Sequence, residues 1–196
     1  DGETIQRSSM QALKNGMSID LLFEQIAKAR QHTQVPIVLI GYLNQVMQYG
    51  EEKFMQACQK AGVDGLILPD LPVYEFENHY RPIIEAADLR TTFLITPNTT
   101  TERIHDIARL SKGFIYVVSS SSITGSAKGI SPAQIAHFER INQLVIENPT
   151  LIGFGISDAN SFQTACQYAN GAIIGSAFIR ALGNKNDDVA ATCRAF

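Results

Sequence analysis

Short apolar runs that alternate with helical patterns constrain the fold of this chain more than any other feature of its sequence. Six such runs occur, at residues 35–42, 65–69, 91–96, 114–119, 151–155 and 172–175. They lack a clean alternation of apolar and polar residues, which is typical of strands buried on both faces. A strand followed by a helix, repeated about six times, predicts a parallel α/β architecture.

The segments between these runs show the spacing of amphipathic helices. Helices are expected at residues 51–62, 75–87, 101–111, 131–147 and 158–169. Pro82 is expected to kink the second of these or to start a shorter helix, and Ser18 is expected to cap an earlier helix that buries Leu22 and Ile26. The longest of them is expected to place Val145 on its apolar face. No linker, low-complexity stretch or block of charge divides the 196 residues, of which 45% are hydrophobic. We therefore predict a single domain over residues 1–196.

Periodicity alone does not distinguish an open doubly wound sheet from a (β/α) barrel. Ligand-type residues at successive strand ends favour the barrel, because a barrel gathers its active site from the carboxyl ends of many strands. A complete eight-stranded barrel usually needs ~200 to 250 residues. The chain begins at Asp1 rather than Met, and Phe196 falls within a helical pattern. We expect an incomplete barrel, with a processed mature protein as the alternative.

Two of the apolar runs end in glycine and predict a phosphate site. Gly155 and Gly175 follow strands that are one helix apart, Ser176 stands beside the second, and Gly125 lies in an earlier loop. Backbone N–H groups at such positions can approach an anion without an intervening side chain. The alternative is that these are ordinary turn glycines. As a phosphate site, they indicate an enzyme acting on a small phosphorylated molecule.

Other polar residues follow or lie within the predicted strands. Asn44 and Asp70 each come after a strand, and Asp70 suits a catalytic carboxylate and a structural cap equally well. Tyr116 lies inside a strand, where its hydroxyl either meets a ligand or is satisfied within barrel packing. Residues 119–129 are rich in small polar residues, which indicates a lid over the site or else a surface linker.

Composition argues against several classes of function. With 16 basic and 19 acidic residues the net charge is −3 and no basic stripe is present, so no nucleic-acid partner is expected. No apolar run is long enough to predict a membrane span. Cys58, Cys166 and Cys193 lie far apart and are expected to be free thiols in a reducing cytoplasm. The four histidines show no ligand spacing, so no metal site is expected.

Motifs along essentially the whole chain resemble the alpha subunit family of tryptophan synthase. They are, in order, Asp1-Gly2-x-Thr4-Ile5-Gln6, Tyr42 with Asn44, Leu68-Pro69-Asp70-Leu71-Pro72, Tyr116 with the Ser-x-Ser-x-x-Thr-Gly loop, Gly153-Phe154-Gly155-Ile156-Ser157 and Gly175-Ser176-Ala177. The resemblance implies a (β/α)8 TIM barrel, here without its first two strands. It also implies a lyase of tryptophan biosynthesis that cleaves indole-3-glycerol phosphate to indole and glyceraldehyde 3-phosphate by a retro-aldol reaction.

The resemblance further implies a protein partner. In the family, a beta subunit carries pyridoxal phosphate and receives indole through a tunnel, and the alpha subunit itself needs no cofactor. The implied assembly is a cytoplasmic heterotetramer. Contacts with the beta subunit are expected at Tyr42, Asn44, Pro69, Asp70, Leu71 and Pro72.

Site residues carry over from the family by motif. Asp1 matches the aspartate that holds the indole N–H, where its carboxylate would stabilise positive charge on the ring nitrogen. Thr124 and Gly125 match the lid. The phosphate is expected at Gly125, Gly155, Gly175 and Ser176. The substrate pocket is expected to include Ile5, Ile40, Leu68, Tyr116 and Phe154, with Tyr116 beside the glycerol part.

The chain also departs from the family pattern. The family's catalytic glutamate, its general acid and base, lies upstream of the residue that Asp1 matches, and Glu3 is not in register to replace it. Ser120 stands where many members have arginine. We therefore expect the 196 residues alone to be inactive or nearly so.

Other functions stay open at this point. One is another phosphate-binding barrel, such as an isomerase of tryptophan or histidine biosynthesis. A second is a catalytically silent barrel that binds and activates a beta subunit. A third is a barrel fragment without activity.

Overall fold

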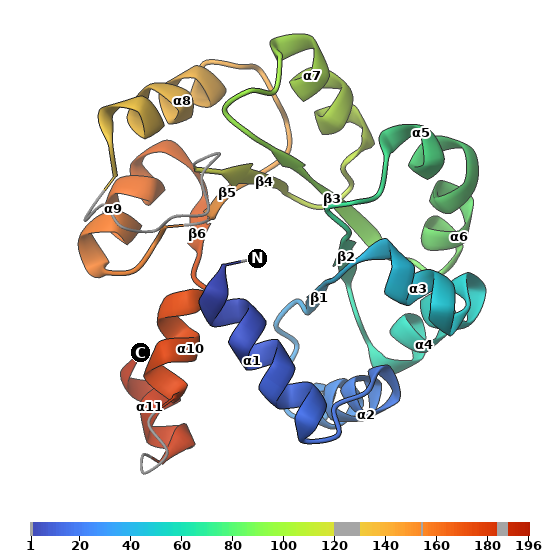
Figure 1. Cartoon of the computed structure of the whole chain (residues 1–196). Coiled ribbons are helices and arrows are strands. Elements are labelled where there is room, and N and C mark those ends of the chain that lie inside the picture. Colours follow the sequence, from blue (N-terminus) through green and yellow to red (C-terminus); the bar gives the residue numbers. More distant parts are fainter. Residues whose placement is uncertain (1, 120–129, 154, 184–187) are drawn as a thin grey trace.

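A computed structural model describes residues 2–119, 130–153, 155–183 and 188–196, and it shows a curled parallel sheet with helices around it (Figure 1). The strands are β1 (Val38–Ile40), β2 (Gly65–Ile67), β3 (Arg90–Ile95), β4 (Ile115–Val118), β5 (Thr150–Gly153) and β6 (Gly171–Ile173). The helices are α1 (Glu3–Lys14), α2 (Ile19–Arg30), α3 (Leu43–Tyr49), α4 (Glu51–Ala61), α5 (Val73–Glu75), η1 (Phe76–Tyr80), α6 (Arg81–Ala86), α7 (Thr101–Leu110), α8 (Pro132–Asn142), α9 (Ala159–Tyr168), α10 (Ser176–Leu182) and α11 (Val189–Ala195).

The order of the strands in the sheet decides between the two predicted architectures. The strands neighbour one another in the sequence order β1-β2-β3-β4-β5-β6, and each neighbouring pair is parallel. A doubly wound sheet would reverse its strand order at one point, and this sheet does not. The predicted (β/α) barrel architecture is confirmed, as a curled six-stranded part of a barrel. Within the described residues β1 and β6 form its two edges.

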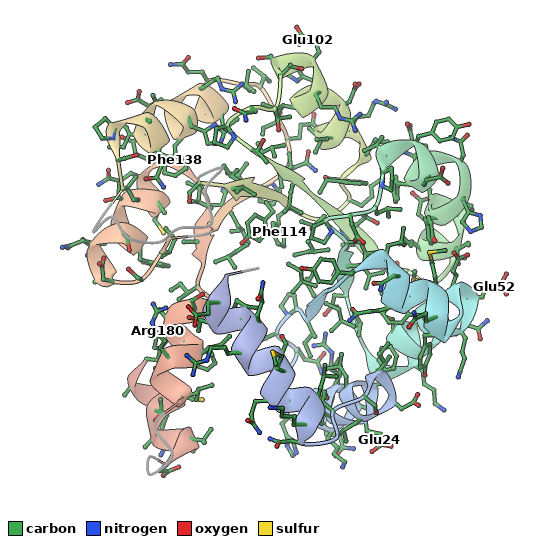
Figure 2. The ribbon with its side chains drawn as sticks, viewed as in Figure 1. Glu24, Glu52, Glu102, Phe114, Phe138 and Arg180 are labelled. Atoms are coloured by element: carbon green, nitrogen blue, oxygen red, sulfur yellow. The ribbon has the colours of Figure 1, made fainter. Side chains whose placement is uncertain are left out.

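The hydrophobic core lies between the sheet and the surrounding helices. Ile115 and Val117 of β4 belong to it and are almost fully buried, whereas Tyr116 between them is buried apart from this core. Successive strand residues point to opposite faces, so Tyr116 lies on the concave face of the sheet. Phe138 projects from α8 into the core, while the acidic side chains at the periphery, Glu24, Glu52 and Glu102, are exposed (Figure 2).

Several predicted element boundaries are wrong. The helix expected at 75–87 is divided into α5, the π-helix η1 and α6; the shorter helix expected at Pro82 is confirmed, because α6 begins at Arg81 with Pro82 in its first turn. The helix expected at 131–147 ends at Asn142, which leaves Val145 92% exposed rather than buried. The strand expected at 35–42 is limited to three residues. Helices α1 and α3 were not predicted.

Candidate functional site

The predicted phosphate residues lie beyond the carboxyl ends of β5 and β6. Gly153 of β5 pairs with Ile173 of β6, so Gly155 and Gly175 each come two residues after this pair. The backbone of Gly155 has φ +79°, a left-handed conformation that glycine adopts without the steric cost of a side chain. A Cβ there would be 3.8 Å from Oγ of Ser119, at the end of β4. The ends of β4 and β5 therefore meet at this point, and β6 pairs with β5 beside them.

Helix α10 begins directly beside Gly175. Gly175 is its N-cap and accepts a hydrogen bond from Ile179 N at 3.1 Å, and Ser176 is the first helical residue. The first N–H groups of a helix have no partner within it and are available to an anion. A Cβ on Gly175 would lie 3.7 Å from Cδ1 of Ile5, and α1 packs against α10 (Figure 1). The structure thus brings Ile5 next to the predicted phosphate residues.

Tyr116 lies on the concave face in close contact with β5. Its side chain is almost fully buried, and a Cβ on Gly153 would overlap Oη, Cζ and Cε1 of its ring. Glycine at position 153 is therefore required for the ring to lie where it does. Burial raises the pKa of Tyr116 to about 12. The phenol consequently stays protonated at neutral pH and can donate a hydrogen bond.

The predicted pocket residues on β1 and β2 are only partly placed as expected. Ile40 is 62% exposed, and its neighbour Leu39 packs toward the core, so Ile40 lies on the concave face. Leu68 is wrong as a pocket residue, because its side chain is buried in the core between sheet and helices. The adjacent Ile67 has the opposite orientation and lies on the concave face, as does Leu94 of β3. Neither was among the predicted pocket residues, because a run that is apolar on both faces does not show which of its residues lie on the concave face.

Four predicted site residues lie outside the described part of the chain. They are Asp1, the lid residues Thr124 and Gly125, and the pocket residue Phe154. Their positions relative to Tyr116 and Gly155 stay predictions.

The residues expected to contact a partner surround two neighbouring loops. Both carboxylate oxygens of Asp70 accept the N–H of Leu43, at 2.9 and 3.1 Å, so Asp70 fastens the loop after β2 to the start of α3. This is the structural role that sequence analysis held equal to a catalytic one. Four of the remaining predicted contacts are exposed, namely Tyr42, Asn44, Pro69 and Pro72. Leu71 is wrong as a contact, because its side chain is buried in the core.

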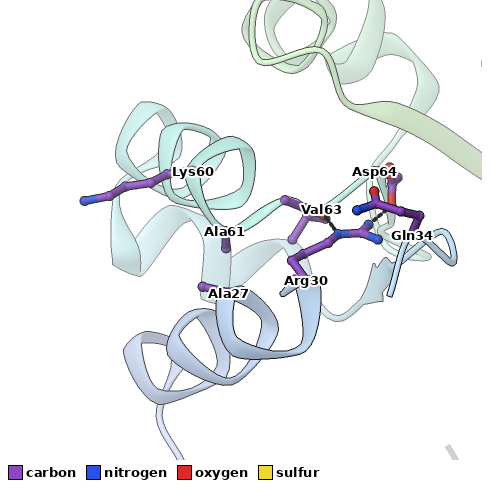
Figure 3. Close-up of a pocket in the computed structure, with 8 residues that line it drawn as sticks. Ala27, Arg30, Gln34, Lys60, Ala61, Val63 and Asp64 are labelled. Carbon is purple, nitrogen blue, oxygen red and sulfur yellow. Dashed lines mark hydrogen bonds and ion pairs between the residues drawn. The ribbon is translucent and has the colours of Figure 1, made fainter. Parts of the chain in front are cut away.

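A polar pocket of about 460 Å³ lies at the opposite end of the sheet (Figure 3). Its centre is Arg30, which donates to the carbonyls of Gly62 at 2.6 Å and Val35 at 2.7 Å and forms an ion pair with Asp64. These residues precede β1 and β2, so the pocket lies at the amino ends of the strands. In (β/α) barrels this end serves stability, whereas the carboxyl end carries the chemistry.

The described residues hold neither a metal-binding cluster nor a membrane-spanning helix. No group of three or more His, Cys, Asp or Glu side chains there is arranged to hold a metal ion. None of the helices in the same residues combines the length and hydropathy needed to cross a bilayer.

Comparison with known proteins gives a consistent result. A family model described as tryptophan synthase alpha chain matches residues 1–195. The tryptophan synthase alpha chain of Christiangramia forsetii is 51% identical over 180 residues, which cover 92% of this chain and 70% of that protein. The counterpart in Bacteroides thetaiotaomicron is 44% identical over 187 residues, or 95% of this chain and 73% of that protein. The solved tryptophan synthase A-subunit of Pyrococcus furiosus matches with TM-score 0.89 and 31% identity, covering 100% of this chain and 78% of that one.

Proposed function

This chain belongs to the tryptophan synthase alpha chain family, and we propose that it provides the phosphate-binding and indole-binding surfaces of a lyase that cleaves indole-3-glycerol phosphate. Membership of the family makes it a lyase of tryptophan biosynthesis. The products of the proposed retro-aldol reaction are indole and glyceraldehyde 3-phosphate.

One observation carries the proposal, namely that Gly155 and Gly175 lie beyond the paired ends of β5 and β6, with Ser119 at the end of β4 next to Gly155. Gly155 and Gly175 lie at equivalent positions beyond paired strand ends, and α10 begins at Ser176. This arrangement offers N–H groups and one hydroxyl to a phosphate dianion. Binding the phosphate there fixes one end of the substrate, so the indole end is directed along the concave face.

On the concave face, apolar side chains are proposed to bind the indole ring of the substrate, and a polar side chain is proposed to bind its glycerol chain. Ile40, Ile67 and Ile5 supply apolar surface suited to a flat indole ring. Tyr116, which stays neutral, is a hydrogen-bond donor for the glycerol hydroxyls. The proposed role of Asp1 is to accept the indole N–H and stabilise the cation that forms when carbon 3 is protonated.

The proposed acid–base step needs a further carboxylate. In the family pattern a glutamate takes the hydroxyl proton of the glycerol chain and delivers a proton to carbon 3, after which the carbon–carbon bond breaks. Asp1 is the residue by which this chain is proposed to contribute to that step.

A beta subunit is the proposed protein partner. The exposed residues Tyr42, Asn44, Pro69 and Pro72 surround two loops that Asp70 holds together, which gives a partner a preformed surface. In the proposal the beta subunit holds pyridoxal phosphate and receives indole, and the alpha chain uses no cofactor of its own. A heterotetramer in the cytoplasm is the proposed assembly and location, and the free thiols of Cys58, Cys166 and Cys193 suit such a reducing compartment.

The test is indole release from indole-3-glycerol phosphate by the intact protein that contains this chain, with and without its beta subunit. Ser176→Ala should raise KM by about tenfold, because it removes a hydrogen bond to a charged phosphate. Ser9→Ala, on the exposed face of α1, is the matched control and should leave KM unchanged. An intact protein that binds and activates a beta subunit but releases no indole would establish the silent-barrel alternative instead.

A further inference from the structure

Arg140 of α8 joins groups that lie about forty residues away in the sequence. Its Nη1 donates to the carbonyl of Thr99 at 3.0 Å, and its Nη2 donates to the carbonyl of Pro97 at 3.1 Å. Both carbonyls belong to the loop between β3 and α7, at the carboxyl end of the sheet. The guanidinium is partly buried, and its two donors match the two carbonyls in a way that a single ammonium group cannot.

The same guanidinium also contacts a buried histidine one turn earlier on α8. Nη2 of Arg140 lies 3.4 Å from Nδ1 of His137, whose side chain is 5% exposed. Burial and the charge of Arg140 lower the pKa of His137, while an interaction with the backbone of Val118 acts in the opposite sense. The ring is therefore neutral at physiological pH. Since Nδ1 faces a donor, it must accept, and the proton must lie on Nε2.

His137 lies near the backbone of Val118 at the end of β4. Its Nε2 is buried and makes no hydrogen bond within 3.5 Å to any described residue, and the Val118 backbone favours the protonated ring. Val118 pairs with Gly153 and follows Tyr116 by two residues. The Ser119 N–H donates to the Gly153 carbonyl at 3.1 Å. Arg140 thus reaches the loop after β3 through two hydrogen bonds, and β3 pairs with β4 at Leu94–Tyr116 and Ile95–Val117, beside the candidate site.

We propose that Arg140 is a positioning residue, itself in contact with His137, that holds the loop after β3 against α8 and so keeps the paired ends of β3 and β4, and with them Tyr116, in place for the reaction. This inference rests on the proposed function. Arg140 does not contact the surfaces assigned to substrate, so it acts through Tyr116 and the strand ends. The sequence carries no local pattern that predicts the contacts of Arg140 with Thr99 and Pro97, because they span about forty residues.

Kinetics of the intact protein test the positioning role. Arg140→Met should lower kcat by about tenfold, because small displacements of positioned groups cost one to two orders of magnitude in rate. KM should change by less than about twofold, since the groups proposed to bind phosphate come from β5, β6 and α10. Arg103→Met, on the exposed face of α7, is the matched control and should keep both constants. Should Arg140→Met fail to fold, Arg140→Lys is measured instead, with an expected loss of about threefold.

Chemical rescue separates positioning from a general effect on stability. Guanidinium ion at low, non-denaturing concentration should restore part of the activity of Arg140→Ala by occupying the vacated site. Because guanidinium destabilises folded proteins, such recovery cannot come from a gain in stability. Arg103→Ala should show no response. A kcat for Arg140→Met equal to that of the wild type, or an Arg140→Ala variant that guanidinium does not reactivate, would overturn the proposal.

The contact between Arg140 and His137 can be tested by spectroscopy, independently of turnover. In ¹⁵N NMR of the intact protein, His137 should show a protonated Nε2 and an unprotonated Nδ1 at neutral pH, and Arg140→Met should change this signature. An intact wild-type protein that releases no indole would refute the proposed function, while the His137 signal would still test the pair. A His137 tautomer that is the same with and without Arg140 would overturn the inference.

Discussion

The contact between Gly153 and Tyr116 is tight enough to predict the effect of adding one methyl group. A Cβ at position 153 would lie less than 3.0 Å from Oη, Cζ and Cε1 of Tyr116, whereas ordinary van der Waals contact begins at 3.4 Å. The ring of Gly153→Ala would have to move by about 1 Å to restore normal contact distances. Tyr116 is 6% exposed and is flanked by β3 and β5, so this displacement must disturb the packing around it. Overpacking of this kind typically costs ~1–3 kcal/mol of unfolding free energy.

Gly153→Ala should therefore reduce both stability and activity. Urea unfolding followed by circular dichroism measures the first, and indole release by the intact protein measures the second. A shift of ~1 Å in a positioned group can lower the rate by about 100-fold. Gly171→Ala on β6 is the control, because a Cβ there would meet only the terminal Cδ2 of Leu151, at 3.0 Å. That flexible methyl can move aside, so the control should lose less than ~1 kcal/mol.

A second substitution shows whether the Tyr116 ring is the cause. Tyr116→Leu removes the aromatic atoms that the new methyl group would overlap. The double variant Gly153→Ala/Tyr116→Leu should be more stable than the sum of the single effects predicts, with a coupling free energy of ~1–3 kcal/mol. Equal stability of Gly153→Ala and the wild type, or strictly additive single effects, would refute the argument from the close contact.

Three further predictions concern residues away from the phosphate end. Glu51 accepts a hydrogen bond from Tyr80, which is the main reason its pKa lies below the ordinary value. The stability it contributes is present above the unfolded-state pKa and is lost as pH falls through the folded-state pKa, so Glu51→Gln should flatten the acid side of a stability-versus-pH curve. Asp70→Ala removes the acceptor of the Leu43 N–H and should cost ~1 kcal/mol, with faster hydrogen exchange of that amide. Arg30→Met should cost ~2–3 kcal/mol in urea unfolding and leave kcat/KM unchanged, because it breaks three interactions at the amino ends of the strands.

The fold could be predicted from the sequence because its signals are local. Strands that are buried on both faces read as continuous apolar runs, and each run here is followed by a helical period. The same property explains the error at Leu68. A run that is apolar on both faces carries no record of which residues point inward, so a shift of one position exchanges Leu68 for Ile67.

Element boundaries depended on interactions that a local pattern does not contain. Val145 continues the helical spacing of α8, yet the helix stops at Asn142 and the side chain is exposed. Leu71 and Asp70 are adjacent, and only the structure shows that one anchors the segment in the core while the other fastens it to Leu43. Burial and hydrogen bonding are decided by parts of the chain that are distant in sequence.

Some features of the candidate site also follow from local sequence, whereas others depend on residues that are distant in the sequence. The position of Gly155, Gly175 and Ser176 at the carboxyl ends of β5 and β6 was predictable, because each follows a buried apolar run; their role in binding phosphate stays a prediction. The contact of Gly153 with Tyr116 joins residues that are 37 positions apart in the sequence. No spacing rule relates such a pair, since it results from strand register.

The amino ends of β1 and β2 and the carboxyl ends of β5 and β6 are built differently, and this has consequences for mutation. At the amino ends, long side chains bridge several backbone carbonyls, as Arg30 does to Gly62 and Val35. At the carboxyl ends of β5 and β6, the chain uses glycines, which leave backbone N–H groups accessible but contribute little packing. Substitutions at these two places should therefore differ in their effect on activity. Arg30→Met and Gly153→Ala can lose similar amounts of unfolding free energy, and only the second should lower kcat/KM. Parallel losses of activity in both variants would show that the two ends are not independent.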